Sequence, residues 1–168
     1  NGSNTFVVVG WSGTILTSLD GISWTSRNME SSTHITGGVS YANSTFFGLD
    51  LSGKIFASSD GTSWTLVRLS GSNDLYRVTY GNSTLVATGE KGLILTSLDG
   101  TSTVNSSWTM RTSGFYGTPT NLYDNTYGNS TFVTIGSSGN ILTSSDGTTW
   151  TSKTYGTSNN LYGVTYKE

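Results

Sequence analysis

Four aspartates recur at nearly regular intervals, and their type and spacing could do chemistry. Asp20, Asp60, Asp99 and Asp146 are separated by 40, 39 and 47 positions. Each stands in a Ser-x-Asp-Gly phrase that follows a short apolar run and precedes a tryptophan, in order Trp24, Trp64, Trp108 and Trp150. An aspartate in such a turn can bind a metal ion, take part in acid–base catalysis, or accept hydrogen bonds from the backbone of its own turn.

The surrounding residues argue against metal binding and catalysis. Each phrase holds one carboxylate with no second acid beside it, which makes a poor oxygen site for a hard cation. His34 is the only histidine and there is no cysteine, so a multi-histidine or thiolate site is excluded. The other acids show no pairing of the kind that glycoside hydrolysis needs: Glu30, Asp50, Asp74, Glu90, Asp124 and Glu168. We therefore expect no catalytic residue, no metal and no cofactor.

The aspartates mark a repeat that covers the whole chain. A large apolar residue lies 14 positions before each aspartate: Phe6, Phe46, Leu85 and Phe132. In three repeats a Tyr-(Gly/Ala)-Asn-Ser-Thr turn precedes it, beginning at Tyr41, Tyr80 and Tyr127. Each unit reads as four short strands rich in β-branched and aromatic residues, separated by turns of Gly, Asn and Ser. No stretch shows a sustained helical period.

Four-stranded units of this length are typical of β-propeller blades, because a lone sheet cannot bury both of its faces. A β-trefoil would need three units where this chain has four, and a β-solenoid would have shorter rungs. We predict an all-β propeller with one domain, 1–168, and four antiparallel blades: 4–27 plus 161–166, 36–68, 75–112 and 122–154. The C-terminal strand would complete the first blade and hide two sheet edges.

The four phrases Ser18–Trp24, Ser58–Trp64, Ser97–Trp108 and Ser144–Trp150 resemble the Asp boxes of BNR-type propellers. They are shortened boxes, with Gly directly after Asp, and are similar to those of photosystem assembly-factor-like propellers and of bacterial extracellular repeat proteins. The resemblance implies that each aspartate stabilises the turn between the third and fourth strands and that each tryptophan packs between blades.

Sialidases also carry Asp boxes, so the resemblance raises the question of catalysis. Their chemistry uses a tyrosine nucleophile, an acid pair and three clustered arginines. Here Arg27, Arg68 and Arg111 fall near the fourth strands of different blades, where they would lie apart. We therefore expect that the chain is not an enzyme.

Composition excludes several classes of partner. Only 11% of the residues are charged and the net charge is −2, whereas nucleic acids and anionic membranes are bound by clustered Lys and Arg. No apolar run approaches the about 20 residues that cross a bilayer. We expect no nucleic acid and no membrane insertion. The scarcity of charge, with much Ser, Thr, Asn and Gly, favours an extracellular or cell-surface location.

Candidate ligand residues lie in loops that vary among the repeats. Trp11, Phe115 and Tyr116 are aromatic residues in such loops and could stack on sugars or anchor a protein partner. Arg77 and Asp124 occupy equivalent positions in the innermost strands, where we expect an ion pair across the central channel. The main hypothesis is a non-catalytic, lectin-like module that binds carbohydrate. The alternative is a protein–protein interaction domain or a purely structural repeat domain.

The number of blades in the ring stays open at this point. Four blades could close within one chain. Two chains could instead join as a homodimer that closes an eight-bladed ring, or the array could extend further.

Overall fold

The computed structural model describes residues 4–28, 35, 37–68, 71–100, 108–153 and 156–167. These residues form fifteen β-strands and three short 3-10 turns, and none of them lies in an α-helix. Consequently no helix in the described ranges could span a membrane. His34, Glu30, Glu168 and the predicted insert Thr101–Asn105 fall outside this part of the chain.

The strands form four antiparallel sheets, each a meander in chain order. The first sheet contains β1 (Phe6–Val9), β2 (Thr14–Ser18) and β3 (Thr25–Asn28). The second contains β4 (Gly38–Ala42), β5 (Thr45–Leu49), β6 (Ile55–Ser58) and β7 (Thr65–Arg68). The third contains β8 (Leu75–Gly81), β9 (Thr84–Gly89), β10 (Ile94–Ser97) and β11 (Thr109–Arg111). The fourth contains β12 (Leu122–Gly128), β13 (Thr131–Gly136), β14 (Ile141–Ser144) and β15 (Thr151–Lys153).

The repeated Asn-Ser pairs make the hairpins between first and second strands. Asn82 and Ser83 have φ values of 45° and 55°, and Asn129 and Ser130 have 44° and 55°. Two consecutive positive φ values match the right-handed twist of the flanking strands, and Asn tolerates this conformation better than most residues. The second and third strands are joined by 3-10 turns η1 (Trp11–Gly13), η2 (Glu90–Gly92) and η3 (Ser137–Gly139).

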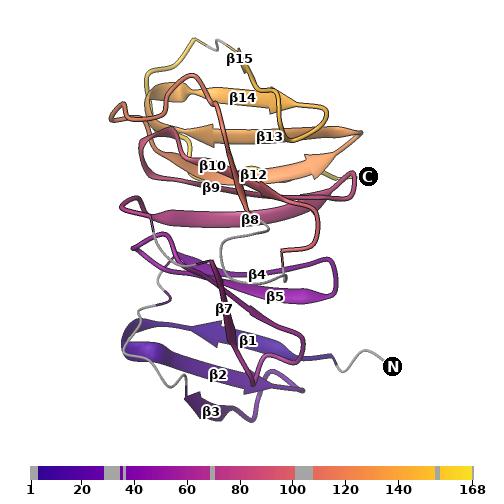
Figure 1. Cartoon of the computed structure of the whole chain (residues 1–168). Coiled ribbons are helices and arrows are strands. Elements are labelled where there is room, and N and C mark those ends of the chain that lie inside the picture. The colour runs from indigo at the N-terminus through magenta and orange to yellow at the C-terminus, as the bar shows by residue number, and fades with distance from the viewer. Residues whose placement is uncertain are drawn as a thin grey trace.

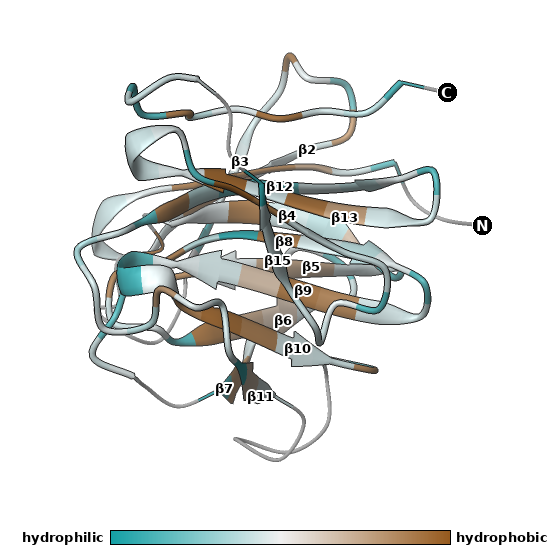
Figure 2. Ribbon diagram, turned by 90° about the horizontal axis from the view of Figure 1, so that it is seen from above, coloured by the Kyte–Doolittle hydropathy of each residue, from teal (hydrophilic) through white to brown (hydrophobic). Residues whose placement is uncertain are grey.

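The four sheets follow one another in a row, with the first and the fourth at opposite ends (Figure 1). The innermost strands β4, β8 and β12 lie next to one another in that order. In Figure 2 hydrophobic residues colour parts of several strands, among them β9, β10 and β13. The sheets are therefore the blades of the predicted all-β architecture.

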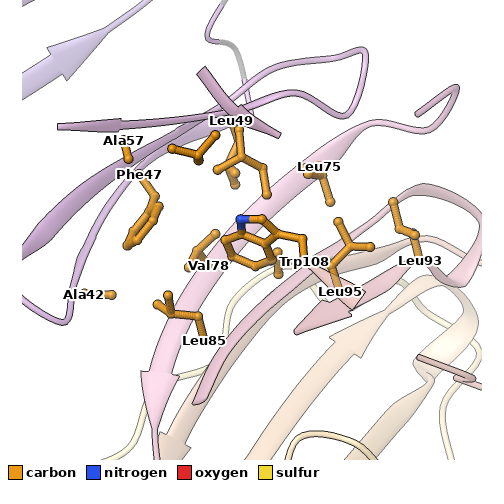
Figure 3. Close-up of a cluster of buried hydrophobic side chains, with 13 residues drawn as sticks. Ala42, Phe47, Leu49, Ala57, Leu75, Val78, Leu85, Leu93, Leu95 and Trp108 are labelled. Carbon is orange, nitrogen blue, oxygen red and sulfur yellow. The ribbon is translucent and has the colours of Figure 1, made fainter. Parts of the chain in front are cut away.

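The core consists of three hydrophobic layers, one in each space between consecutive blades. The middle layer joins the second and third blades and holds, among others, Phe47, Leu49, Val78, Leu95 and Trp108. Figure 3 shows the Trp108 ring among these side chains. The layers on either side are centred on Ile15 with Phe56 and on Val86 with Phe132, Ile94 and Leu142. Consecutive blades thus bury apolar faces against each other, which is how an array of small sheets becomes stable.

The predicted closure of the first blade by residues 161–166 is wrong for the single chain. The first sheet has three strands, with β1 at its edge. The C-terminal segment instead lies against β12, where the Val164 N–H donates to Asp124 Oδ2 at 3.0 Å. The Tyr162 and Tyr123 rings also meet there, with centroids 4.9 Å apart. These contacts hold the segment at the fourth blade, at the far end of the row from β1 (Figure 1).

Candidate functional site

The Ser and Asp of a box form a closed set of hydrogen bonds inside their own turn. In the fourth box, Ser144 Oγ donates to Asp146 Oδ1 at 2.9 Å. The same carboxylate oxygen accepts the N–H groups of Thr148 and Thr149 at 2.7 and 2.8 Å. A single aspartate therefore satisfies backbone donors that would otherwise need water.

The same arrangement recurs in the first and second boxes, around Asp20 and Asp60. In the third box, Ser97 Oγ accepts the N–H of Gly100 at 2.8 Å, as its counterparts do. Residues 101–107, which follow, lie outside the described part. The turn geometry that the sequence resemblance implied is thus present in the first, second and fourth boxes and begins in the same way in the third.

These hydrogen bonds keep the box carboxylates ionised. The N–H groups of Ile22 and Ser23 lower the pKa of Asp20 from 3.8 to about 2. Hydrogen bonds within their own turns likewise lower the pKa of Asp60 and of Asp146. A carboxyl group with such a low pKa that is held by its own turn is unsuited to act as a general acid near neutral pH.

The box tryptophans of the second, third and fourth blades each pack against the preceding blade. Trp64 lies against the layer around Ile15 of the first blade, and Trp150 against that of Val86 in the third. The Trp108 ring meets the edge of Phe47 in the second blade, with centroids 6.2 Å apart. The implied role of these residues as spacers between blades is therefore seen directly.

The aromatic residues predicted as ligand contacts are not brought together. Trp11 lies in η1 on the first blade and is 69% exposed. Tyr116 is exposed in the loop between the third and fourth blades. Phe115 is only half-exposed, because it packs against the layer between these blades, and the Lys91 carbonyl accepts the N–H of Gly117 at 2.9 Å. Phe115 therefore packs at the edge of the core and keeps part of its ring exposed, so its role as a ligand contact stays a prediction.

Arg77 and Asp124 form an ion pair between neighbouring inner strands. Arg77 Nε lies 3.3 Å from Asp124 Oδ1, which also accepts the N–H of Asn125 at 2.9 Å. The other carboxylate oxygen binds the Val164 N–H. The sequence analysis expected an ion pair, and one is present. It joins the adjacent strands β8 and β12, and through Asp124 it also holds the C-terminal segment. The terminal nitrogens of Arg77 have no hydrogen-bond partner within the described ranges, and its side chain is half-exposed.

Three tyrosines that the sequence reasoning missed stand in a row, near the start of β8, of β12 and of the C-terminal segment. The Tyr76 and Tyr123 ring centroids are 5.8 Å apart, and those of Tyr123 and Tyr162 are 4.9 Å apart, with rings tilted by 36° at both contacts. We call Tyr76, Tyr123 and Tyr162 the tyrosine row. Each follows a leucine, in the phrases Leu-Tyr-Arg, Leu-Tyr-Asp and Leu-Tyr-Gly, so the repeat itself carried the signal.

Polar contacts fix the tyrosine row. Ser137 Oγ donates to the Tyr123 hydroxyl at 3.3 Å, and Asn160 Nδ2 donates to the Tyr162 hydroxyl at 3.1 Å. Burial raises the pKa of Tyr76 to about 12, with nearby acids adding to the effect, so its hydroxyl stays protonated. The row thus presents ordered amphipathic side chains at one end of the inner strands.

Two shallow hollows lie near these elements. One, of 440 Å³, lies between β4 and β8 and is lined by Ser40, Tyr41, Arg77, Thr79 and Tyr80, among others. The other, of 460 Å³, lies between the first two boxes and includes Asp20, Arg27 and Asp60 in its lining. The carboxylates of Asp20 and Asp60 in this hollow accept hydrogen bonds from backbone N–H groups of their own turns. No group of three or more His, Cys, Asp or Glu side chains that could hold a metal occurs among the described residues.

Comparison with known proteins gives likenesses of structure. No protein family matches the sequence, and no curated protein does. YCF48 from Cyanidioschyzon merolae superposes on 98% of this chain with a TM-score of 0.69 and 17% identity. YCF48 bound to D1 peptide superposes on 89% with a TM-score of 0.63 and 17% identity. The chain spans 58% and 50% of the length of these two structures. The chain is thus an all-β propeller array of four blades.

Proposed function

We propose that this chain is a non-catalytic module that binds a protein segment through the tyrosine row. One of the similar structures, YCF48, is bound to a D1 peptide, so a propeller of this kind can accept a peptide. That likeness supports the alternative stated from the sequence better than the lectin-like reading. We also retain an extracellular location as a proposal, on composition.

The observation that carries the proposal is the ordered tyrosine row itself. Tyr162 is 69% exposed although it stacks on Tyr123, and its hydroxyl is held by Asn160. Tyrosine is enriched in protein interfaces because it offers a large contact area and a polar group for little loss of side-chain entropy. Fixing the rings before binding reduces the entropy cost of association.

The stacking also favours a protein segment over a sugar. A sugar stacks on the face of an aromatic ring, but the ring faces inside the row are covered by neighbouring rings. Ring edges, hydroxyl groups and the outer face of Tyr162 remain for contact, and these suit backbone amides and apolar side chains. Trp11 has no aromatic counterpart in the other blades, where Leu51, Glu90 and Ser137 stand in the equivalent turns. A set of equivalent sugar sites has no support here.

Arg77 adds a charged group on β8, directly after Tyr76 in sequence. Its two terminal nitrogens are directed donors that fit a carboxylate, although Asp124 reduces the net positive charge. We expect peptides with an acidic residue beside an apolar one to bind best. The homodimer considered from the sequence is the other protein partner that we keep as a proposal.

The experiment uses a random linear peptide library displayed on phage and selected on the wild-type chain. Selected peptides are then measured against Tyr162→Ala and Tyr123→Ala. We expect a loss of affinity of about 5- to 150-fold, since removing a central interface tyrosine costs about 1–3 kcal/mol. Trp11→Ala is the matched control, because Trp11 and Tyr162 are both 69% exposed.

Two results would overturn the proposal. One is that no peptide is selected, or that selected peptides bind the two tyrosine variants as tightly as the wild type. The other is a signal on a glycan array that disappears in Trp11→Ala, which would restore the carbohydrate hypothesis.

A further inference from the structure

Every Asp box contains a pair of residues that is chemically reactive in unstructured chains, an aspartate followed by a glycine. Such pairs occur in the four boxes and nowhere else in the sequence: Asp20-Gly21, Asp60-Gly61, Asp99-Gly100 and Asp146-Gly147. The backbone nitrogen of the glycine can attack the side-chain Cγ of the aspartate, because no Cβ hinders its approach. An N–Cγ bond then forms, and the N–H proton leaves with the carboxyl hydroxyl as water.

The product of this attack is a five-membered succinimide ring, which water opens at either carbonyl. Opening at the Cγ carbonyl restores aspartate. Opening at the other carbonyl breaks the original peptide bond and leaves isoaspartate, whose main chain runs through Cβ and Cγ. In the fourth box this would lengthen the main chain by one carbon and displace the carboxylate that accepts the N–H groups of Thr148 and Thr149. Isomerisation would therefore destroy the turn.

The turn cannot avoid this reaction by replacing its glycine. The four box glycines have φ values of 74°, 77°, 67° and 73°, in the left-handed region that side chains disfavour. A Cβ at position 61 would lie 2.7 Å from Val7 Cγ2, and one at position 100 would lie 2.8 Å from Phe47 Cε1, both on the preceding blade. Backbone conformation and packing thus both require glycine, so protection must come from another residue of the box.

A serine at the same place in all four boxes holds the nitrogen that would attack. In each box the glycine N–H donates to the serine Oγ at 2.8 Å, in the pairs Gly21 with Ser18, Gly61 with Ser58, Gly100 with Ser97, and Gly147 with Ser144. The proton in this hydrogen bond is the one that must leave when the N–Cγ bond forms. Attack therefore requires that the hydrogen bond to serine breaks first.

The same hydroxyl also holds the group that would be attacked. Ser144 Oγ donates to Asp146 Oδ1 at 2.9 Å, and the equivalent bonds in the first and second boxes are 2.9 and 3.0 Å long. An ionised carboxylate resists attack because it has no hydroxyl to lose, so the protonated form is the one that reacts. Backbone hydrogen bonds, aided by the serine, lower the pKa of Asp20 to about 2. At neutral pH its protonated form is therefore rarer than that of an ordinary aspartate by more than about tenfold.

We propose that the box serine is a protecting residue: it keeps the glycine nitrogen and the aspartate carboxylate in separate hydrogen bonds, and its loss makes that box a site of spontaneous isoaspartate formation. One hydroxyl acts on both reacting groups, as donor to the carboxylate and as acceptor of the glycine N–H. This role goes beyond the proposed peptide binding and does not depend on it.

The four boxes supply internal controls for the experiment, because a change in one box leaves the other three intact. The wild type, Ser144→Ala and Ser144→Thr are incubated folded at neutral pH, and isoaspartate at each box is measured by mass spectrometry of the digested chain. We expect Ser144→Ala to form isoaspartate at position 146 about tenfold faster than the wild type, since two hydrogen bonds are lost. The rates at positions 20, 60 and 99 should not change. Ser144→Thr keeps the hydroxyl and should remain close to the wild type at all four positions.

A fourth variant separates protection by serine from general stability. A Cβ at position 81 would lie 2.1 Å from Tyr127 Cγ, so Gly81→Ala disturbs the packing between blades while every box keeps its serine. It should not accelerate the reaction at position 146 as Ser144→Ala does. In the wild-type chain unfolded in urea, the bond at position 20 should react at least about tenfold faster than in the folded chain.

Three results would overturn the proposal. The first is a rate at position 146 that is the same in Ser144→Ala and the wild type. The second is an equal acceleration in Ser144→Thr or in Gly81→Ala. The third is a folded wild type whose boxes react as rapidly as the unfolded chain. None of these results bears on peptide binding by the tyrosine row, which is measured separately.

Discussion

At the scale of the residue, the box aspartate stabilises its own turn by accepting hydrogen bonds. Asp146 accepts two backbone N–H groups and the hydroxyl groups of Ser144 and Thr148. All of these partners lie within three residues of it in sequence, so the turn depends on no other blade. This explains why the phrase recurs with so little change while its surroundings differ.

Asp146→Ala should lower the free energy of unfolding by about 1–2 kcal/mol, because the turn donors lose a charged acceptor. Asp146→Asn keeps one carbonyl oxygen and should lose less than half as much. Chemical denaturation of the three proteins measures both effects. Equal stability of the alanine variant and the wild type would show that water replaces the carboxylate at no cost.

At the scale of the element, glycines at the ends of the inner strands set the distance between blades. A Cβ at position 81 would lie 2.1 Å from Tyr127 Cγ, and one at 128 would lie equally close to Tyr166 Cγ. Neither glycine has a positive φ, so the requirement comes from the neighbouring ring and not from the backbone. The strand–strand contact of consecutive blades thus depends on a missing side chain.

Gly81→Ala should destabilise the chain by about 1–3 kcal/mol, because the tyrosine ring must leave its position to admit the methyl group. Gly163→Ala is the matched control: it lies in the equivalent phrase of the C-terminal segment, and nothing comes within 4 Å of its Cβ position. Thermal or urea unfolding compares the two. A Gly81→Ala variant as stable as Gly163→Ala would disprove this account of blade spacing.

At the scale of the whole molecule, the box carboxylates set the response to acid. The pKa values of Asp20, Asp60 and Asp146 are lowered in the folded chain, so the unfolded chain binds protons more readily and acid favours it. Their contribution is present above the ordinary pKa of 3.8 and is lost as pH falls through the folded values, about 2 for Asp20. Asp74 acts in the opposite sense, since burial raises its pKa.

The denaturation midpoint should therefore fall as pH is lowered from about 4 to about 2. A triple variant with Asn at positions 20, 60 and 146 should have a lower denaturation midpoint than the wild type at about pH 4. Its midpoint should also change less between about pH 4 and about pH 2. Urea titrations at several pH values provide the measurement. A wild-type midpoint that is constant across this window would rule out the turn carboxylates as its source.

Much of this fold follows from the sequence because the repeat restates each element several times. The spacing of the four aspartates and of Phe6, Phe46, Leu85 and Phe132 located the blades and the strands beside them. Contacts between segments that are distant in sequence could be predicted less well. Residues 161–166 match both β12 and the missing strand of the first blade, and only the three-dimensional arrangement shows that they lie on β12.

The candidate site was harder to predict than the fold. Trp11, Phe115 and Tyr116 were predicted as ligand contacts because they are aromatic residues in variable loops. In the structure Phe115 packs against the hydrophobic layer between the third and fourth blades. The tyrosine row lies in the repeated strands, outside the variable loops in which the sequence analysis placed the candidate ligand residues. Its exposure depends on how far each ring is covered by the next blade, which a sequence pattern does not report.

The separation of the core into three layers has a consequence for cooperativity. Each layer couples only two adjacent blades, so stability spreads along the chain by nearest-neighbour terms and not through one shared centre. The inner blades are supported on both sides, whereas the first blade has three strands and a single supporting layer. A change that loosens one layer should therefore weaken the two blades that share it more than the blades beyond them, so local opening can occur without loss of the other layers.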